Sequence, residues 1–163
     1  MERIQHPIPP LFDAGSRALI LGSFPSVKSR EQGFFYGHAQ NRFWRVISAL
    51  AGQPLPQTIP EKRQLILSSH LALWDVIASC EIVGSSDSSI SHVIANDLSV
   101  ILEHAQVRCI FLNGRTAEKY FYRYNKMDES ISVISLPSTS PANAAWSFER
   151  LCEAWGKIWT FLD

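Results

Sequence analysis

The loop 22-GSFPSVKS-29 differs by one residue from the P-loop pattern G-x-x-x-x-G-K-[ST], which binds nucleotide phosphates. A P-loop needs glycine at its sixth position, because the backbone there takes up a conformation that other residues avoid. Val27 occupies that position, and a β-branched residue is poorly suited to positive φ. Pro25 also removes one backbone N–H donor. We therefore expect no nucleotide phosphate in this loop.

The next segment, 33-GFFYGHAQN-41, combines aromatic, imidazole and amide groups. We expect Phe34, Phe35 and Tyr36 to be partly exposed, because glycines bracket them in a loop. Exposed rings beside polar groups suit a flat heteroaromatic ligand that is stacked and read at its edge. His38 is either a proton donor to such a ligand, a phosphate contact or an ordinary surface histidine.

Asn41 precedes a helical pattern, so it is a candidate helix N-cap and also a candidate catalytic group. Cleavage of a deoxyribosyl bond places positive charge on the sugar and negative charge on the leaving base. A side-chain amide can accept a hydrogen bond from water and donate one to the base, but it is not a strong base. Most of the acceleration would then come from placement and preorganised electrostatics.

A third polar segment is 136-LPSTSPANAAW-146, in which Ser140 is a good N-cap and Pro141 a good first helical residue. We predict a helix that begins here. Its N-terminus, together with the hydroxyls of Ser138, Thr139 and Ser140, would favour an anion such as a backbone phosphate. A plain capping motif explains the same residues.

Four apolar runs must position these loops: residues 18–21, 73–77, 107–112 and 131–136. Each is nearly continuous in apolar residues, which is typical of parallel strands covered on both faces. Helical patterns lie between and after them, over residues 43–50, 94–102, 117–124 and 148–162, and residues 52–60 look like a connector. We predict an α/β fold whose ligand binds beyond the carboxyl ends of the strands.

Two polar residues, Asp75 and Asn113, fall at predicted strand ends that face this crevice. Either could read the edge of a base. Asp75 could equally be a cap, and Asn113 a turn residue before Gly114.

Composition narrows the class of protein. The chain has 163 residues, 46% of them hydrophobic, and no linker or repeat divides it, so we expect one domain over residues 1–163. The 15 basic and 15 acidic residues cancel, so any nucleic-acid contact must come from a local patch. Three scattered cysteines suit a reducing cytosol, and no run is long enough to span a membrane. We expect a soluble, cytoplasmic protein that is a monomer.

Taken in order, GSFPSVKS, FFYGHAQNRFW, LWDVIASCEIVGSSDSSI, IFLNGRTA and LPSTSPANA resemble the hypoxanthine-DNA glycosylase family, the deoxyinosine-excising branch of the uracil-DNA glycosylase superfamily. The resemblance runs from about Arg17 to the final helix. It implies a three-layer α/β/α fold with a four-stranded parallel sheet. It also implies a monofunctional enzyme that flips a deaminated base out of double-stranded DNA and hydrolyses its N-glycosidic bond, with no metal and no cofactor.

The resemblance assigns roles to residues. The family's catalytic amide, the Asn of H-P-Q-N-x-F-W, falls on Asn41, although Ala39 replaces the usual Pro. The base pocket comprises Gly22, Ser23, Phe24, Pro25, Phe35, Tyr36, His38, Asp75 and Asn113, where Phe24, Phe35 or Tyr36 could stack on the base. Contacts to the DNA backbone are expected from Ser26, Ser138, Thr139, Ser140, Pro141 and Asn143.

One departure bears on the substrate. The His that usually leads the superfamily's second motif is replaced in the neighbourhood of Ser138, Thr139 and Ser140, which argues against strong uracil excision and favours the deoxyinosine branch. Two alternatives stay open: a DNA-binding module of the same fold that has lost catalysis, and an enzyme that acts on free nucleosides. We do not expect a hydrolase with a triad of Ser23, His38 and Asp75, because the sequence has no nucleophile-elbow pattern.

Overall fold

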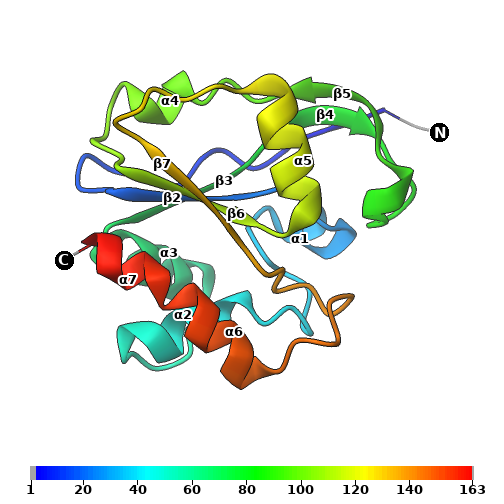
Figure 1. Ribbon diagram of the computed structural model, residues 1–163. Coiled ribbons are helices and arrows are strands. Elements are labelled where there is room, and N and C mark those ends of the chain that lie inside the picture. The colour runs from blue at the N-terminus through cyan, green and yellow to red at the C-terminus, as the bar shows by residue number, and fades with distance from the viewer. Residues whose placement is uncertain (1–2, 163) are drawn as a thin grey trace.

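The computed structural model describes residues 3–162 and is built around a four-stranded parallel sheet (Figure 1). Its strands are β2 (Ala18–Gly22), β3 (Leu71–Asp75), β6 (Cys109–Asn113) and β7 (Ser132–Leu136), in the order β3-β2-β6-β7. Every residue of β2 and β3 is buried, because the sheet is covered on both faces. All four predicted strands are therefore confirmed, with ends shifted by one or two residues.

Helices form a layer on each side of this sheet (Figure 1). One layer contains α2 (Phe43–Ala51), α3 (Ile59–Ser68), α6 (Phe148–Trp155) and α7 (Lys157–Leu162), and the other contains α4 (Ser99–Leu102) and α5 (Arg115–Tyr124). A short helix, α1 (Val27–Gln32), follows β2. The longest of these helices has ten residues, so none within residues 3–162 could cross a membrane.

A second sheet of three antiparallel strands was not predicted. It consists of β1 (Arg3–Gln5), β4 (Ile77–Glu81) and β5 (Ser91–Ala95), in the order β1-β4-β5. The predicted run 73–77 crosses from β3 into β4, which begins after Val76. The helix expected over 94–102 is also wrong in its first half, because Ile94 belongs to β5 and only Ser99–Leu102 is helical.

Two further helical predictions need correction. The connector expected over 52–60 ends inside α3, whose first turn contains Pro60 and whose capping box joins Thr58 to Glu61. The single helix expected over 148–162 is divided at Gly156 into α6 and α7. Its apolar stripe still packs into the core, where Leu151, Trp155 and Ile158 are fully buried.

Candidate active site

A cavity of about 300 Å³ lies beyond the carboxyl ends of the parallel strands. Its wall comes from the end of β3 and from the segments after β2, β6 and β7, with Ser85 and Asp87 added from the segment between β4 and β5. The parallel arrangement brings these loops to one edge of the sheet. The lining residues are Gly22, Ser23, Phe24, Pro25, Ser26, Ser29, Phe35, Tyr36, His38, Asn41, Asp75, Ser85, Asp87, Asn113, Ser138, Thr139, Ser140, Pro141 and Ala142.

The structure brings together all but one of the residues that the resemblance assigns to catalysis, the base pocket or the DNA contacts. Asn143 is the exception, because it lines a neighbouring cavity instead. Sequence reasoning missed Ser29, Ser85, Asp87 and Ala142 in the wall. Ser29 belongs to α1, and the other three lie in Ser-rich segments that follow strands, which was the only signal for them in the sequence.

Asn41 lies at the entrance to α2 with its side chain partly engaged in capping. Its Oδ1 accepts a hydrogen bond from the backbone N–H of Phe43 at 2.9 Å, while Arg42 occupies the N-cap position. No residue between 3 and 162 accepts a hydrogen bond from Asn41 Nδ2. The two interpretations of Asn41 are thus compatible, because its oxygen orients the side chain and its NH₂ group remains a donor at the cavity wall.

The aromatic loop is packed inward, so the expectation that its rings are exposed is wrong for two of the three. Phe34 and Phe35 are buried, and the indole N–H of Trp44 donates to the backbone oxygen of Phe35 at 3.1 Å. Tyr36, at a positive φ of 53°, stacks on Phe43 with ring centroids 4.0 Å apart. The loop therefore packs onto α2 instead of projecting into solvent.

Asn113 is held by the protein on both sides of its amide. Its Nδ2 donates to Tyr36 Oη at 3.2 Å and to Thr139 Oγ1 at 3.0 Å, and its Oδ1 accepts from the backbone N–H of Thr139 at 3.1 Å. Both amide hydrogens are therefore used within the protein. In this arrangement Asn113 ties β6 to the loop after β7.

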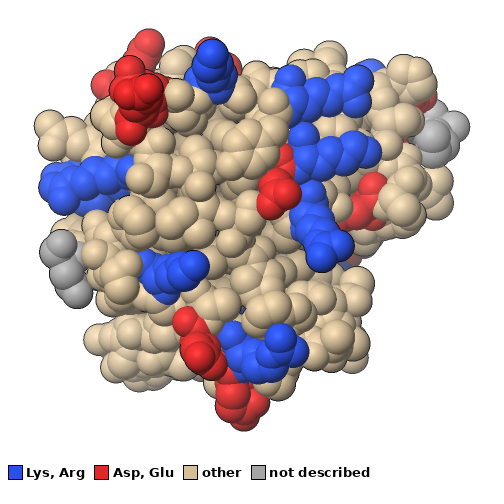
Figure 2. Space-filling view, in the orientation of Figure 1, with Lys and Arg blue, Asp and Glu red and all other residues tan. Residues whose placement is uncertain are grey.

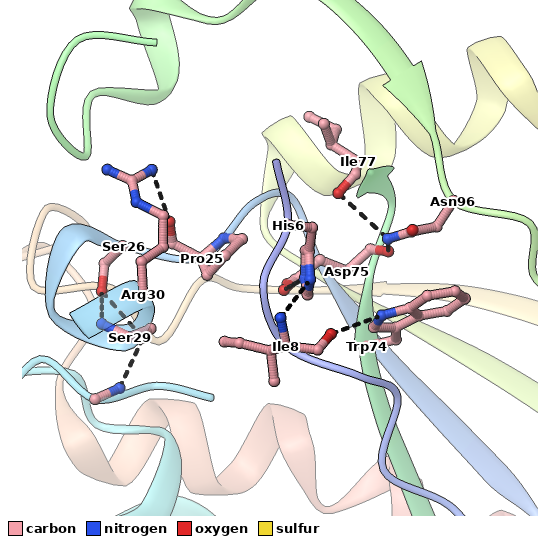
Figure 3. A network of polar contacts seen from close by, with 11 residues as sticks. His6, Ile8, Pro25, Ser26, Ser29, Arg30, Trp74, Asp75, Ile77 and Asn96 are labelled. Carbon is pink, nitrogen blue, oxygen red and sulfur yellow. Dashed lines mark hydrogen bonds and ion pairs between the residues drawn. The ribbon is translucent and has the colours of Figure 1, made fainter. Parts of the chain in front are cut away.

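Asp75 is buried at the end of β3 (Figure 3). Its carboxylate is hydrogen-bonded to His6, a residue that the sequence did not single out. His6 Nε2 lies 2.7 Å from Asp75 Oδ2, and the side chains of both residues are almost completely buried. The backbone N–H of Ile8 donates to His6 Nδ1 at 3.2 Å, so Nδ1 is an acceptor and Nε2 carries the hydrogen. His6 therefore donates to the Asp75 carboxylate.

Gly22 lets the Asp75 carboxylate and the Tyr36 hydroxyl approach the same point. A Cβ at position 22 would lie 2.5 Å from Asp75 Oδ1 and 3.2 Å from Tyr36 Oη. Burial, and secondarily the negative charge of Asp75, raises the pKa of Tyr36 well above its ordinary value. The phenol therefore keeps its proton at neutral pH.

The loop after β7 does not form the predicted helix. Residues 137–147 form turns and irregular backbone, in which Ser140 Oγ accepts from the N–H of Ala142. The next helix begins at Phe148 with Ser147 as its cap. Arg42 holds this loop instead. Its guanidinium donates to the carbonyl oxygens of Ser140 at 3.2 Å and Asn143 at 3.0 Å, and also to that of Trp146.

The predicted DNA contacts in this loop divide into two groups. Thr139 is fully buried and bound to Asn113, so its side chain faces the protein rather than a phosphate. Ser138, Ser140 and Pro141 lie in the cavity wall and are only partly buried. A second cavity of about 660 Å³ adjoins the first through Asp87, Ser138, Ser140 and Ala142, and Arg115 and Asn143 contribute to its wall.

Several polar groups of the loop after β2 form hydrogen bonds within the protein. Ser26 caps α1 by accepting from the N–H of Ser29 at 3.1 Å, and the N–H of Val27 donates to Ser85 Oγ at 2.9 Å. Ser23 Oγ donates to Asp87 Oδ1 at 3.3 Å, and desolvation by its surroundings raises the pKa of the Asp87 carboxyl. The loop therefore forms a wall of the cavity.

Comparisons with known proteins identify the family. The model of the uracil DNA glycosylase superfamily matches residues 9–163. A hypoxanthine DNA glycosylase from Methanosarcina acetivorans is 35% identical over 152 residues, which cover 92% of this chain and 95% of that protein. A protein of the same name from Methanosarcina barkeri is 29% identical over 114 residues, or 69% of this chain and 72% of its own.

A solved structure agrees with the fold. The solution NMR structure of a Methanosarcina acetivorans protein, described as a candidate uracil DNA glycosylase, superimposes with a TM-score of 0.81 at 32% identity. The match covers 95% of this chain and 96% of that one. The family resemblance and the three-layer fold with a four-stranded parallel sheet are thereby confirmed. The chain belongs to the uracil DNA glycosylase superfamily.

Proposed function

We propose that this protein is a monofunctional DNA glycosylase that removes hypoxanthine from deoxyinosine in double-stranded DNA. The relatives named for that activity support the substrate. The observation that carries the proposal is the free amide donor of Asn41 at the wall of a cavity lined by polar and aromatic residues. At about 300 Å³ the cavity falls at the lower end of small-ligand pockets, which suits one base. A base in a duplex must be flipped out of the stack to enter it.

Asn41 is the proposed catalytic residue. As the N-glycosidic bond breaks, negative charge grows on the purine, and Asn41 Nδ2 is free to donate a hydrogen bond to it. The amide is held in place by the bond from Phe43, so little reorganisation is needed. His38 is a second donor, because the N–H of Gln40 occupies its Nδ1 at 3.1 Å and leaves the hydrogen on Nε2.

Asp75 is the proposed reader of the base edge. Hypoxanthine carries a hydrogen on N1, whereas adenine has an unprotonated acceptor there. A carboxylate can accept from the first and is repelled by the lone pair of the second. Asn113 was the other candidate, but its two amide hydrogens are already used, so we assign it to positioning Tyr36 and Thr139.

A local basic surface supports binding to the DNA backbone despite the zero net charge. Lys and Arg side chains gather over α5 in Figure 2. Arg115, Lys119 and Arg123 are exposed and spaced four residues apart, so they share one face of α5, and Arg115 reaches the second cavity. We propose that the duplex runs over this basic row, with its backbone also met by Ser26, Ser138, Ser140, Pro141 and Asn143.

We also propose that the protein acts as a monomer of one domain. The three cysteines are free, which supports a reducing compartment such as the cytoplasm.

An excision assay tests the proposal. Duplexes that each carry one deoxyinosine, deoxyuridine or deoxyxanthosine are incubated with the protein and then treated with alkali. We expect a single cut with deoxyinosine, and a loss of at least about 100-fold in Asn41→Ala. The matched control is Asn125→Ala, at the distant end of α5, which should cut at the parent rate.

Other outcomes favour the alternatives. Binding to the damaged duplex without release of any base, unchanged in Asn41→Ala, would indicate a DNA-binding module. Release of base from free deoxyinosine as fast as from DNA would indicate a nucleoside enzyme. Absence of cutting on every duplex in the panel would refute the glycosylase proposal.

A further inference from the structure

Two polar atoms in the cavity have unused hydrogen-bonding capacity. Asp75 is 5% exposed, and its Oδ2 is occupied by His6, while Oδ1 has no donor among residues 3–162. Tyr36 Oη accepts from Asn113, but no acceptor for its own hydrogen lies within the described part of the chain. One atom is thus a free acceptor and the other a free donor.

These two atoms face the same small space. Both Oδ1 and Oη lie within 3.2 Å of the point that a Cβ of residue 22 would fill. Asp75 and Tyr36 also line the cavity together with Gly22. The cavity wall therefore presents an acceptor and a donor next to each other, at a position that Gly22 leaves open.

Deamination creates the complementary pair of groups on a base. Adenine has an N–H donor at C6 and an acceptor at N1, and hypoxanthine has the reverse, a carbonyl at C6 and N1–H. A hydroxyl donor beside a carboxylate acceptor matches hypoxanthine and opposes adenine. Uracil shows the same carbonyl and N–H pattern relative to cytosine, so this pair separates deaminated bases from their amino precursors rather than from one another.

His6 holds the Asp75 side chain in one orientation. The imidazole is fixed from behind by the N–H of Ile8 and is enclosed by the rings of Phe24, Phe35 and Trp74. The backbone oxygen of Asp75 is held separately by Asn96 Nδ2 at 2.9 Å. The hydrogen bond to His6 fixes Oδ2 and leaves Oδ1 beside Gly22 at the cavity wall. His6 itself does not line the cavity.

We propose that His6 and Tyr36 determine which bases the pocket accepts: Tyr36 donates to the C6 carbonyl, and His6 is a positioning residue that holds Asp75 as the acceptor for N1–H. The inference rests on the proposed function of the site, and it adds the basis of discrimination. Tyr36 thus acts through its hydroxyl and not as the stacking ring that the sequence suggested. Its ring is already stacked on Phe43.

Binding measurements test this without relying on bond cleavage. The probes are duplexes with one 2′-fluoro-deoxyinosine or one 2′-fluoro-deoxyadenosine, whose glycosidic bonds resist hydrolysis. The dissociation constants of the two give a ratio for each variant. In the parent protein we expect tighter binding of the inosine duplex.

Four substitutions are compared. Tyr36→Phe removes only the hydroxyl, and we expect the ratio to fall roughly tenfold; Asp75→Asn should lower it by about 100-fold, because it removes a charged partner and adds a donor facing N1–H. His6→Phe should also lower the ratio, and His6→Gln, which keeps a donor, should restore part of it. Tyr122→Phe on the exposed surface and His104→Gln are matched controls that should leave it unchanged.

The outcomes separate this inference from the proposed function. Equal ratios in the parent, Tyr36→Phe and Asp75→Asn would overturn the inference, even if the parent cuts deoxyinosine. A parent that binds selectively and loses selectivity in the variants supports the inference, even if it releases no base. Melting temperatures identify a variant that fails to fold. If His6→Phe fails to fold, His6→Gln decides: a ratio below that of the parent in a folded protein supports the positioning role, and a ratio equal to that of the parent overturns it.

Discussion

At the scale of single residues, the site depends on the absence of a side chain as much as on the side chains present. Gly22 ends β2 beside Asp75 and Tyr36, and its φ is not in the left-handed region. Glycine is required there by space rather than by backbone conformation, because a Cβ would lie 2.5 Å from Asp75 Oδ1. The same space is where we place the edge of the base.

We therefore expect Gly22→Ala to lower kcat/KM for deoxyinosine excision by about 100-fold, since the methyl group displaces the Asp75 carboxylate and occupies the place of the base. Steady-state kinetics on the deoxyinosine duplex measure the effect. Gly156→Ala is the matched control, because its Cβ would meet no atom closer than 3.4 Å. Activity retained in Gly22→Ala would show that the base edge lies elsewhere.

At the scale of elements, the loop after β7 is ordered by one guanidinium and not by a helix. Arg42 begins α2 next to Asn41, and it reaches three carbonyl oxygens of residues 140–146. Its own backbone N–H donates to the oxygen of Thr139 at 3.1 Å. This clamp links the proposed catalytic amide to the loop that we expect to meet the phosphates.

Arg42→Lys should loosen this loop, because an ammonium on a flexible stem cannot reproduce the planar fork of a guanidinium. We expect faster amide hydrogen exchange in residues 138–146 and a rise in KM of about tenfold, with a smaller change in kcat. Hydrogen exchange with mass spectrometry and steady-state kinetics measure these effects. Arg45→Lys, on the exposed face of α2, is the control, and equal exchange in both variants would contradict the clamp.

At the scale of the whole molecule, basic residues are concentrated on one surface, so a chain with no net charge can still bind the DNA backbone. The 15 basic and 15 acidic residues cancel in total, yet three basic residues share one face of α5 beside the second cavity. Each Lys or Arg that contacts a phosphate displaces a condensed counterion, so binding through such a row weakens as salt rises.

Replacing Lys119 and Arg123 with Ala should raise KM and make log Kd less dependent on log salt, with a slope lower by about 2. The charge-matched control replaces Arg45 and Lys157, which are exposed on the other helical layer. Fluorescence anisotropy over a salt series measures the slope. Equal slopes in the two double variants would place the DNA on another face.

The sequence was sufficient for the parallel sheet and for most of the pocket. A strand buried on both faces must be apolar at consecutive positions, and that signal is local, as residues 18–21 and 107–112 illustrate. Once the strands are known to be parallel, the loops that follow them must converge. For that reason, residues as distant as Gly22 and Ser138 could be assigned to one site from the sequence, and both line the cavity.

Only the tertiary structure decided which groups in that site remain free. His6 meets Asp75 across 69 positions and Arg42 meets Trp146 across 104, and no periodicity or spacing records such contacts. The same applies to the burial of Phe34 and Phe35, to the second sheet and to the two occupied hydrogens of Asn113. The sequence determined which chemical groups gather at the sheet edge, because the signals for strands and turns are local. Which of them still have a donor or acceptor to offer was decided by packing, because it depends on partners that are distant in the chain.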